Sequence, residues 1–242
     1  MSVALPLALA AVLTLAPAPA PSSPGYRVAR AKASAEALLS AEDDAWAPAQ
    51  AITWGPAPYE TRFRALSGET GLALRFDATD PSPWHTMTKH DDHLWEEEVV
   101  EIFLDLNRSG HDYAEIEISP GNVVCDVRMV SPWPHKQMDL AWDLSGLETR
   151  VRMAKDATGQ TTGWTATALL PWTGFRSLPS SARVALPPKP GDAWRFNVFR
   201  VKRPGGPGAP EKGAVEAAWS KPPVESFHVP EAFRDFVFDT AR

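Results

Sequence analysis

Hydrophobic and polar residues alternate along most of the chain after residue 58. The segments YETRFRAL (residues 59–66) and GLALRFDA (residues 71–78) both follow a period of two, and the turn sequence SGET separates them. Alternation on both sides of a glycine-containing turn predicts a β-hairpin. In its second strand we expect Leu72, Leu74 and Phe76 to share the core face.

The most charged stretch, KHDDHLWEEEVVEIFLDLN (residues 89–107), leads into the next expected strand. Four apolar residues of this strand share the core parity: Val100, Ile102, Leu104 and Leu106. Glu101 has the opposite parity and is expected on the non-core face. The loop NRSGHD then leads to YAEIEIS (residues 113–119), where Glu115 and Glu117 have the non-core parity. Because two strands joined by a short loop tend to be neighbours, we expect these three glutamates on one sheet face.

Further short segments with strand character fill the remainder of the chain, and each is bounded by Gly, Pro or Asp: residues 122–129, 147–154, 163–172, 194–203 and 233–239. Only residues 33–40 suggest a helix, and the 24 prolines favour loops over long helices. The expected fold is all-β, an antiparallel β-sandwich or jelly roll with immunoglobulin-like sandwich architecture. We assign residues 24–242 to this single domain.

The N-terminal segment reads as an export signal. Residues 3–16 are almost wholly apolar and Ala-Pro repeats follow, so residues 1–23 are expected to be a signal peptide and Ala/Pro leader. The apolar stretch is too short to span a bilayer comfortably, which predicts a secreted or periplasmic protein without membrane attachment after cleavage. Cys125 is the only cysteine and alternates with Val123 and Val127, so a buried strand thiol is expected.

Composition narrows the function classes. The formal net charge is -6 and no basic stripe is visible, which argues against binding to nucleic acid. The chain has 10 tryptophans but 3 tyrosines. An indole either packs in the core or offers a flat apolar face for stacking on a sugar ring.

The charged stretch admits catalytic and metal-binding interpretations. Glu96, Glu97, Glu98 and Glu101 could supply the paired carboxylates of a glycosidase, although their spacing selects no proton donor. His85 and the run His90, Asp91, Asp92 and His93 contain metal-ligating types, but they match neither a zinc motif nor an EF-hand loop. A structural calcium ion held by loop carboxylates and a simple solvated loop both stay open, and no metal ligand is assigned.

A binding face is the third interpretation. Trp95 stands just before the strand that carries Glu101, and Glu115 and Glu117 share that face. An indole stacks on the C–H face of a pyranose, and carboxylates accept hydrogen bonds from vicinal hydroxyls. The same residues could instead be structural, with Glu101 held by Arg75 or Arg200.

Several motifs together resemble the family 9 carbohydrate-binding modules. They occur in the family's order over about residues 26–238: LLSAEDDAW, LWEEEVVEIFLD, GWTATALLPW, RFNVF and AWSKPPVESFHVPEAFRDFVF. The resemblance implies a jelly-roll sandwich that binds sugars, typically at the ends of glucan or xylan chains, without cleaving them. It implies that Trp95 and Phe227 clamp a terminal sugar and that Glu101 accepts hydrogen bonds from its hydroxyls. Weaker candidates at the rim are Asn197, Arg200 and His228.

Three positions depart from the family pattern. Glu117 falls where the family has an arginine, Val224 where it has an asparagine, and Thr167 where it has a glutamate. A lost charged hydrogen bond costs roughly 1.5–3 kcal/mol, so we expect the fold to carry over while the ligand or its affinity differs. Calcium ions occur in the family, so a structural calcium ion is compatible with the resemblance, but no cofactor is required.

We therefore expect an exported, non-catalytic carbohydrate-binding protein that acts in polysaccharide breakdown, in association with secreted glycosidases. Two alternatives stay open. One is a b-type haem electron-transfer sandwich, for which four methionines are available although no ligand pair is evident: Met87, Met129, Met138 and Met153. The other is a hydrolase that acts on glycosidic bonds.

Overall fold

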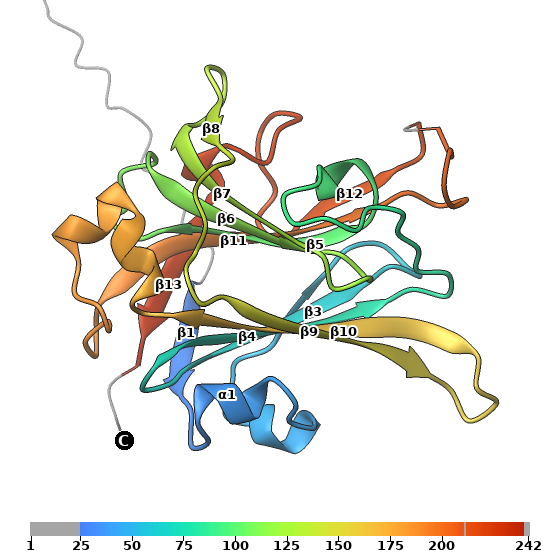
Figure 1. Cartoon of the computed structure of the whole chain (residues 1–242), viewed down its shortest axis with the longest axis horizontal. Coiled ribbons are helices and arrows are strands. Elements are labelled where there is room, and N and C mark those ends of the chain that lie inside the picture. The colour runs from blue at the N-terminus through green and yellow to red at the C-terminus, as the bar shows by residue number, and fades with distance from the viewer. Residues whose placement is uncertain (1–24, 211, 240–242) are drawn as a thin grey trace, which may run out of the picture.

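Strands in two face-to-face layers form the protein, shown as a computed structural model in Figure 1. The structure describes residues 25–210 and 212–239, so the expected leader at 1–23 lies outside them. Within these ranges there are thirteen strands: eleven follow one another in a hydrogen-bonded path, and two more pair with strands of that path. The upper layer of Figure 1 contains β5 (Val99–Asp105), β6 (Tyr113–Ile118), β7 (Val124–Ser131), β8 (Gln137–Asp139), β11 (Ala193–Lys202), β12 (Val215–Ala218) and β13 (Arg234–Phe238). The lower layer contains β2 (Ile52–Trp54), β3 (Thr61–Ser67), β4 (Gly71–Thr79), β9 (Glu148–Lys155) and β10 (Thr161–Pro171).

The predicted β-sandwich class is confirmed, with one strand that departs from the antiparallel rule. Strand β1 (Tyr26–Arg30) pairs in parallel with β13 through Tyr26 and with β3 through Ala29. This strand therefore passes from one layer to the other and joins them at one edge. The other pairings in the described residues are antiparallel, including the predicted hairpin of β3 and β4.

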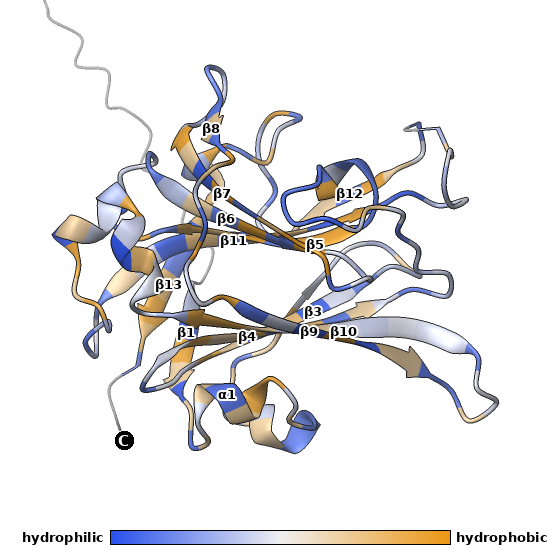
Figure 2. Ribbon diagram, in the orientation of Figure 1, coloured by the Kyte–Doolittle hydropathy of each residue, from blue (hydrophilic) through white to orange (hydrophobic). Residues whose placement is uncertain are grey.

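The core lies between the two layers and follows the predicted parity. Ile102 of β5 and Leu74 of β4 belong to the same buried cluster, together with Trp164 and Phe196 from neighbouring strands. Figure 2 shows hydrophobic residues along the strands of both layers. Burying a large apolar side chain contributes about 1.5–3 kcal/mol, so this shared cluster fixes how the layers face each other.

The outer face of the upper layer is also buried. Every residue of β5 is buried, and Phe103 and Val201 belong to a second cluster on this face. The 3-10 helix η2 (Leu94–Glu96) contributes Leu94 to that cluster, and Phe227 packs against it from the segment 219–229, called here the closing loop. The expected alternation is thus correct in direction, but both faces of this layer are covered.

Short helices occupy the loops. The helix expected near residues 33–40 is one turn, α1 (Ala35–Leu38), capped by the Ser34 hydroxyl, which accepts from the Ala37 amide. Together with η1 (Asp43–Trp46) it covers the outer face of the lower layer. Three further 3-10 helices are η3 (Gly174–Ser177), η4 (Pro179–Arg183) and η5 (Pro230–Ala232). No helix among the described residues has the length and apolarity needed to cross a bilayer.

Candidate functional site

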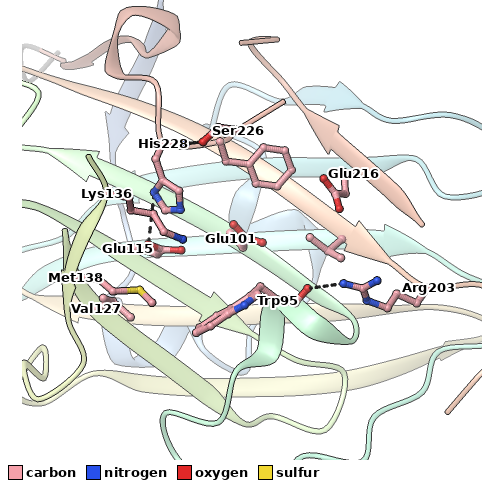
Figure 3. A pocket seen from close by; sticks show the side chains of 12 residues that line it. Trp95, Glu101, Glu115, Val127, Lys136, Met138, Arg203, Glu216, Ser226 and His228 are labelled. Carbon is pink, nitrogen blue, oxygen red and sulfur yellow. Dashed lines mark hydrogen bonds and ion pairs between the residues drawn. The ribbon is translucent and has the colours of Figure 1, made fainter. Parts of the chain in front are cut away.

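A pocket of about 240 Å³ opens on the outer face of the upper layer (Figure 3). We call it the outer pocket. It brings together five of the predicted site residues from η2, β5, β6 and the closing loop: Trp95, Glu101, Glu115, Phe227 and His228. The other lining residues are Val127, Lys136, Met138, Val201, Arg203, Glu216 and Ser226.

Trp95 forms one aromatic wall. Its indole stacks on the His93 ring, with the ring centroids 4.4 Å apart and an interplanar angle of 19°. The Trp95 carbonyl accepts a hydrogen bond from Arg203 Nη2 at 3.4 Å, as Figure 3 shows. The indole is half-buried, so it is held by its neighbours while it lines the pocket.

Phe227 lines the same pocket from the closing loop. Its ring stacks on Phe199 of β11 at a centroid distance of 4.3 Å and an angle of 19°. Asn197 anchors this loop, because its side chain donates to the Ser220 carbonyl at 2.7 Å and accepts from the Ser220 amide at 3.0 Å. Asn197 is fully buried and does not line the pocket, so its observed role is to position the loop that carries Phe227.

Three glutamates meet at the floor of the outer pocket, and we call them the glutamate trio: Glu101, Glu115 and Glu117. Antiparallel pairing sets Glu101 of β5 directly opposite Glu117 of β6, and Glu115 lies on the same face two residues earlier. One carboxylate oxygen from each lies within 4.8 Å of the others. Their exposed fractions are 2%, 5% and 0%. Glu101 and Glu115 line the pocket, whereas Glu117 lies behind them.

The glutamate trio has few partners. Among the described residues, nothing donates a hydrogen bond to Glu101 Oε1 or to either oxygen of Glu117. Burial raises the pKa of both Glu101 and Glu117; repulsion from Glu115 and Glu216 adds to the rise at Glu101, and repulsion from Glu101 and Glu115 together with a hydrogen bond to Glu115 adds to it at Glu117. The alternative that Arg75 or Arg200 holds Glu101 is wrong, because these arginines form ion pairs with Asp77 and Asp80.

His228 is a neutral group in the wall of the pocket. Its Nδ1 lies 3.1 Å from the Tyr113 hydroxyl and 3.9 Å from Glu115 Oε2, and its ring stacks on Phe103. Burial, with a smaller contribution from the positive charge of Lys136, lowers its pKa to about 3. His228 can therefore exchange hydrogen bonds at neutral pH but does not balance the negative charge of the glutamates.

Arg200 lies away from the outer pocket, although we expected it as a weaker candidate at the rim. It shares the inward parity of Phe196 and Val198 on β11, so its side chain points between the layers. There Nη2 lies 2.9 Å from Asp80 Oδ2, and the guanidinium lies 5.2 Å from the centre of the Trp164 ring. Because side chains alternate along a strand, Arg200 and Val201 point to opposite faces of β11, and only Val201 points toward the outer pocket.

Several lining residues were not predicted. Arg203 follows β11 with the outward parity of Val201, so alternation could have indicated it. Lys136 precedes β8 in a loop, and Glu216 lies on the short strand β12. No sequence pattern places either of these two side chains near Trp95.

The charged stretch also supplies part of a second cluster of potential metal ligands. His90 and Asp91 lie with Asp126 and Asp143, and one ligand atom from each is within 4.8 Å of the others. His90 Nε2 is 3.0 Å from Asp126 Oδ1. Asp92 is instead a loop cap that accepts hydrogen bonds from the Thr88 and Lys89 amides. His85 and His93 are not members of this cluster.

Comparisons with known proteins identify the fold. No protein-family model matches the chain. A protein of Arthroderma benhamiae named "Extracellular protein" is 27% identical over 186 residues, which is 74% of this chain and 78% of that protein.

Solved structures extend the comparison over nearly the whole chain. A Bacteroides uniformis protein provisionally described as carbohydrate-binding superposes with a TM-score of 0.65 at 16% identity, over 88% of this chain and 98% of that one. A family 9 carbohydrate-binding module from Caldicellulosiruptor kristjanssonii, in complex with cellotriose, gives a TM-score of 0.59 at 14% identity, over 90% and 94%. Its complex with glucose gives 0.57 at 15% identity, over 89% and 96%. As the resemblance predicted, the chain has the fold of the family 9 carbohydrate-binding modules.

Proposed function

We propose that the outer pocket binds the end of an oligosaccharide or polysaccharide chain without cleaving it. The observation that carries this proposal is the meeting of Trp95 and Phe227 in one pocket whose floor is formed by carboxylates. Apolar ring faces suit the C–H faces of a pyranose, and carboxylate oxygens suit its hydroxyl groups. The neutral His228 adds one further polar group at the wall.

The comparisons support glucose-containing ligands as the first to test. Two of the structures with this fold hold cellotriose and glucose. The name of the Arthroderma relative supports export of this chain, where polysaccharides and secreted glycosidases would be its partners. Glu117 occupies the position of the family's arginine, so the preferred sugar or its affinity is expected to differ from theirs.

A binding role without hydrolysis fits the arrangement of the carboxylates. Glycosidases place two carboxyl groups on either side of the scissile bond, one to protonate the leaving oxygen and one to attack or activate water. Glu101 and Glu115 line the same floor and Glu117 lies behind them, so the three groups are not placed on opposite sides of a bound chain. Reducing-sugar release from xylan or glucan that is lost in Glu101→Gln would contradict this part of the proposal.

Calorimetric titration with glucose, cello-oligosaccharides and xylo-oligosaccharides tests binding directly. Trp95→Ala removes one wall, and we expect its affinity to fall about tenfold or more, equivalent to about 1.4 kcal/mol. Trp133→Ala is the matched control, because Trp133 is 49% exposed and does not line the pocket. Equal affinity in Trp95→Ala and the parent protein would refute the proposed platform.

A further inference from the structure

The glutamate trio has a property that sugar recognition alone does not explain. Hydroxyl groups need acceptors that face the pocket, yet both oxygens of Glu117 are buried behind the floor and have no donor among the described residues. A buried carboxylate without a hydrogen bond or opposite charge is strongly destabilising. While the three carboxylates are ionised, they therefore need a compensating group that the described residues do not supply.

Among the described residues, the basic side chains that line the pocket interact elsewhere or act on the trio at longer range. The nearest ring nitrogen, His228 Nδ1, is 3.9 Å from Glu115 and stays neutral at pH 7. Arg203 Nη2 donates to the Trp95 carbonyl. Lys136 stabilises the ionised glutamates electrostatically, but no ion pair within 4.0 Å joins it to the trio in the described part of the chain.

We propose that Glu101, Glu115 and Glu117 bind a divalent metal ion of the calcium type at the floor of the outer pocket. Three carboxylates offer up to six oxygens, and calcium takes six to eight oxygen ligands at about 2.3–2.6 Å. Oxygens on opposite sides of such an ion are then about 5 Å apart, which matches a group whose atoms lie within 4.8 Å. Zinc is disfavoured by the absence of nitrogen and sulfur ligands from this group.

A cationic ligand group is the main competitor. The ammonium of an amino sugar could also accept contacts from three oxygens at this spacing, but it would have to pass the floor to reach Glu117, which does not line the pocket. A bare ion between the three carboxylates contacts them all. If the pocket binds sugar as proposed above, the side of the ion that faces the pocket is open to sugar hydroxyls.

Calorimetric titration of the full chain with CaCl₂, after treatment with a chelator and without any sugar, tests the metal site separately from the sugar site. We expect saturable binding by the parent protein and an affinity at least about tenfold lower at this site in Glu117→Gln. Asp143→Asn is the control, because it alters the other potential metal cluster and leaves the trio unchanged. Calcium should also raise the Tm of the parent protein by more than it raises the Tm of Glu117→Gln. The rise that remains in Glu117→Gln measures the contribution of the Asp143 cluster.

Other outcomes overturn the proposal. They are the absence of saturable calcium binding, unchanged binding in Glu117→Gln, and loss in Asp143→Asn alone. Glucosamine binding that persists in chelator and is lost in Glu117→Gln would also overturn it, because the trio would then hold an ammonium group. Glu101→Gln provides a second variant if Glu117→Gln does not fold. Since no sugar is present in the calcium titration, its failure is independent of the failure of carbohydrate binding.

Discussion

The outer faces of the two layers both carry groups of charged residues, but only one group pairs opposite charges. On the lower layer, three arginines surround two aspartates: Arg62, Arg64 and Arg75 with Asp43 and Asp77. Arg75 Nη2 lies 2.8 Å from Asp77 Oδ1, and Arg64 Nη2 lies 3.0 Å from Asp77 Oδ2. On the upper layer, the glutamate trio has no such partner among the described residues.

This difference separates a structural cluster from a binding site. Strand alternation carries the charged side chains of β3, β4, β5 and β6 to an outer face, so the local cause is the same in both layers. Where opposite charges meet within the chain, as they also do for Arg200 and Asp80, ion pairs compensate the buried charges. Where buried acids beside a pocket lack counter-charges among the described residues, we propose that a ligand or an ion compensates them.

The largest effect that tests this comparison is expected from Asp77→Asn. The substitution keeps the shape of the side chain but removes one of the two negative charges that hold three arginines. Breaking a buried ion pair from one side costs about 3–5 kcal/mol, and the 20% exposure of Asp77 places the expected loss near the lower limit, about 3 kcal/mol. Urea denaturation measures it, and a loss under about 1 kcal/mol would show that the arginine cluster is not balanced as described.

The next effect is the pH dependence of that loss. Burial raises the pKa of Asp77, but hydrogen bonds and positive charge from Arg75 and Arg64 outweigh burial and leave the pKa below its usual 3.8. The ionised Asp77 therefore adds stability above about pH 4, and this stability disappears as the pH falls through the lowered pKa.

The difference in unfolding free energy between the parent protein and Asp77→Asn should thus be constant from pH 7 to about 4.5. Below about pH 4 it should shrink by at most about 1.4 kcal/mol per pH unit. The glutamate trio is the same in both proteins, so its titration largely cancels in the difference. A difference that grows at low pH would contradict the assignment.

The smallest expected change in unfolding free energy is an increase in stability. Glu117→Gln makes the same acid-to-amide change in the unbalanced group, where it relieves burial of a charge and repulsion among three carboxylates. In chelator at pH 7 or above we expect it to stabilise the fold by about 1 kcal/mol. Glu216→Gln at the exposed rim should stay within about 0.5 kcal/mol of the parent protein. Destabilisation by Glu117→Gln in chelator would indicate that the trio has a partner within the chain.

The sequence predicted the direction of side chains within strands better than the packing of segments that are distant in the sequence. Period-two alternation placed Glu101, Glu115 and Glu117 on one face, because side-chain direction in a strand depends only on parity. The same rule would have excluded Arg200 from that face. Phe227 entered only through the family resemblance, since no local pattern links the closing loop to the strand that carries Glu101.

The burial of the glutamates could not be read from their own strands. It depends on η2 and the closing loop, which pack on the outer face through Leu94 and Phe227. Asn197 fixes that loop through Ser220, a contact between residues 23 positions apart. The parallel pairing of β1 is also non-local and has no signal in its five residues.

The most direct test of the central claim is to locate a bound sugar by heteronuclear NMR. Chemical-shift changes during titration with cellotriose should concentrate at the Trp95 indole N–H and at the amides of Ser226 and Phe227 in the closing loop. They should be small around Arg64 and Asp77 on the other layer. Shifts centred on the arginine cluster, or saturating shifts that leave Trp95 and the closing loop unaffected, would contradict the account.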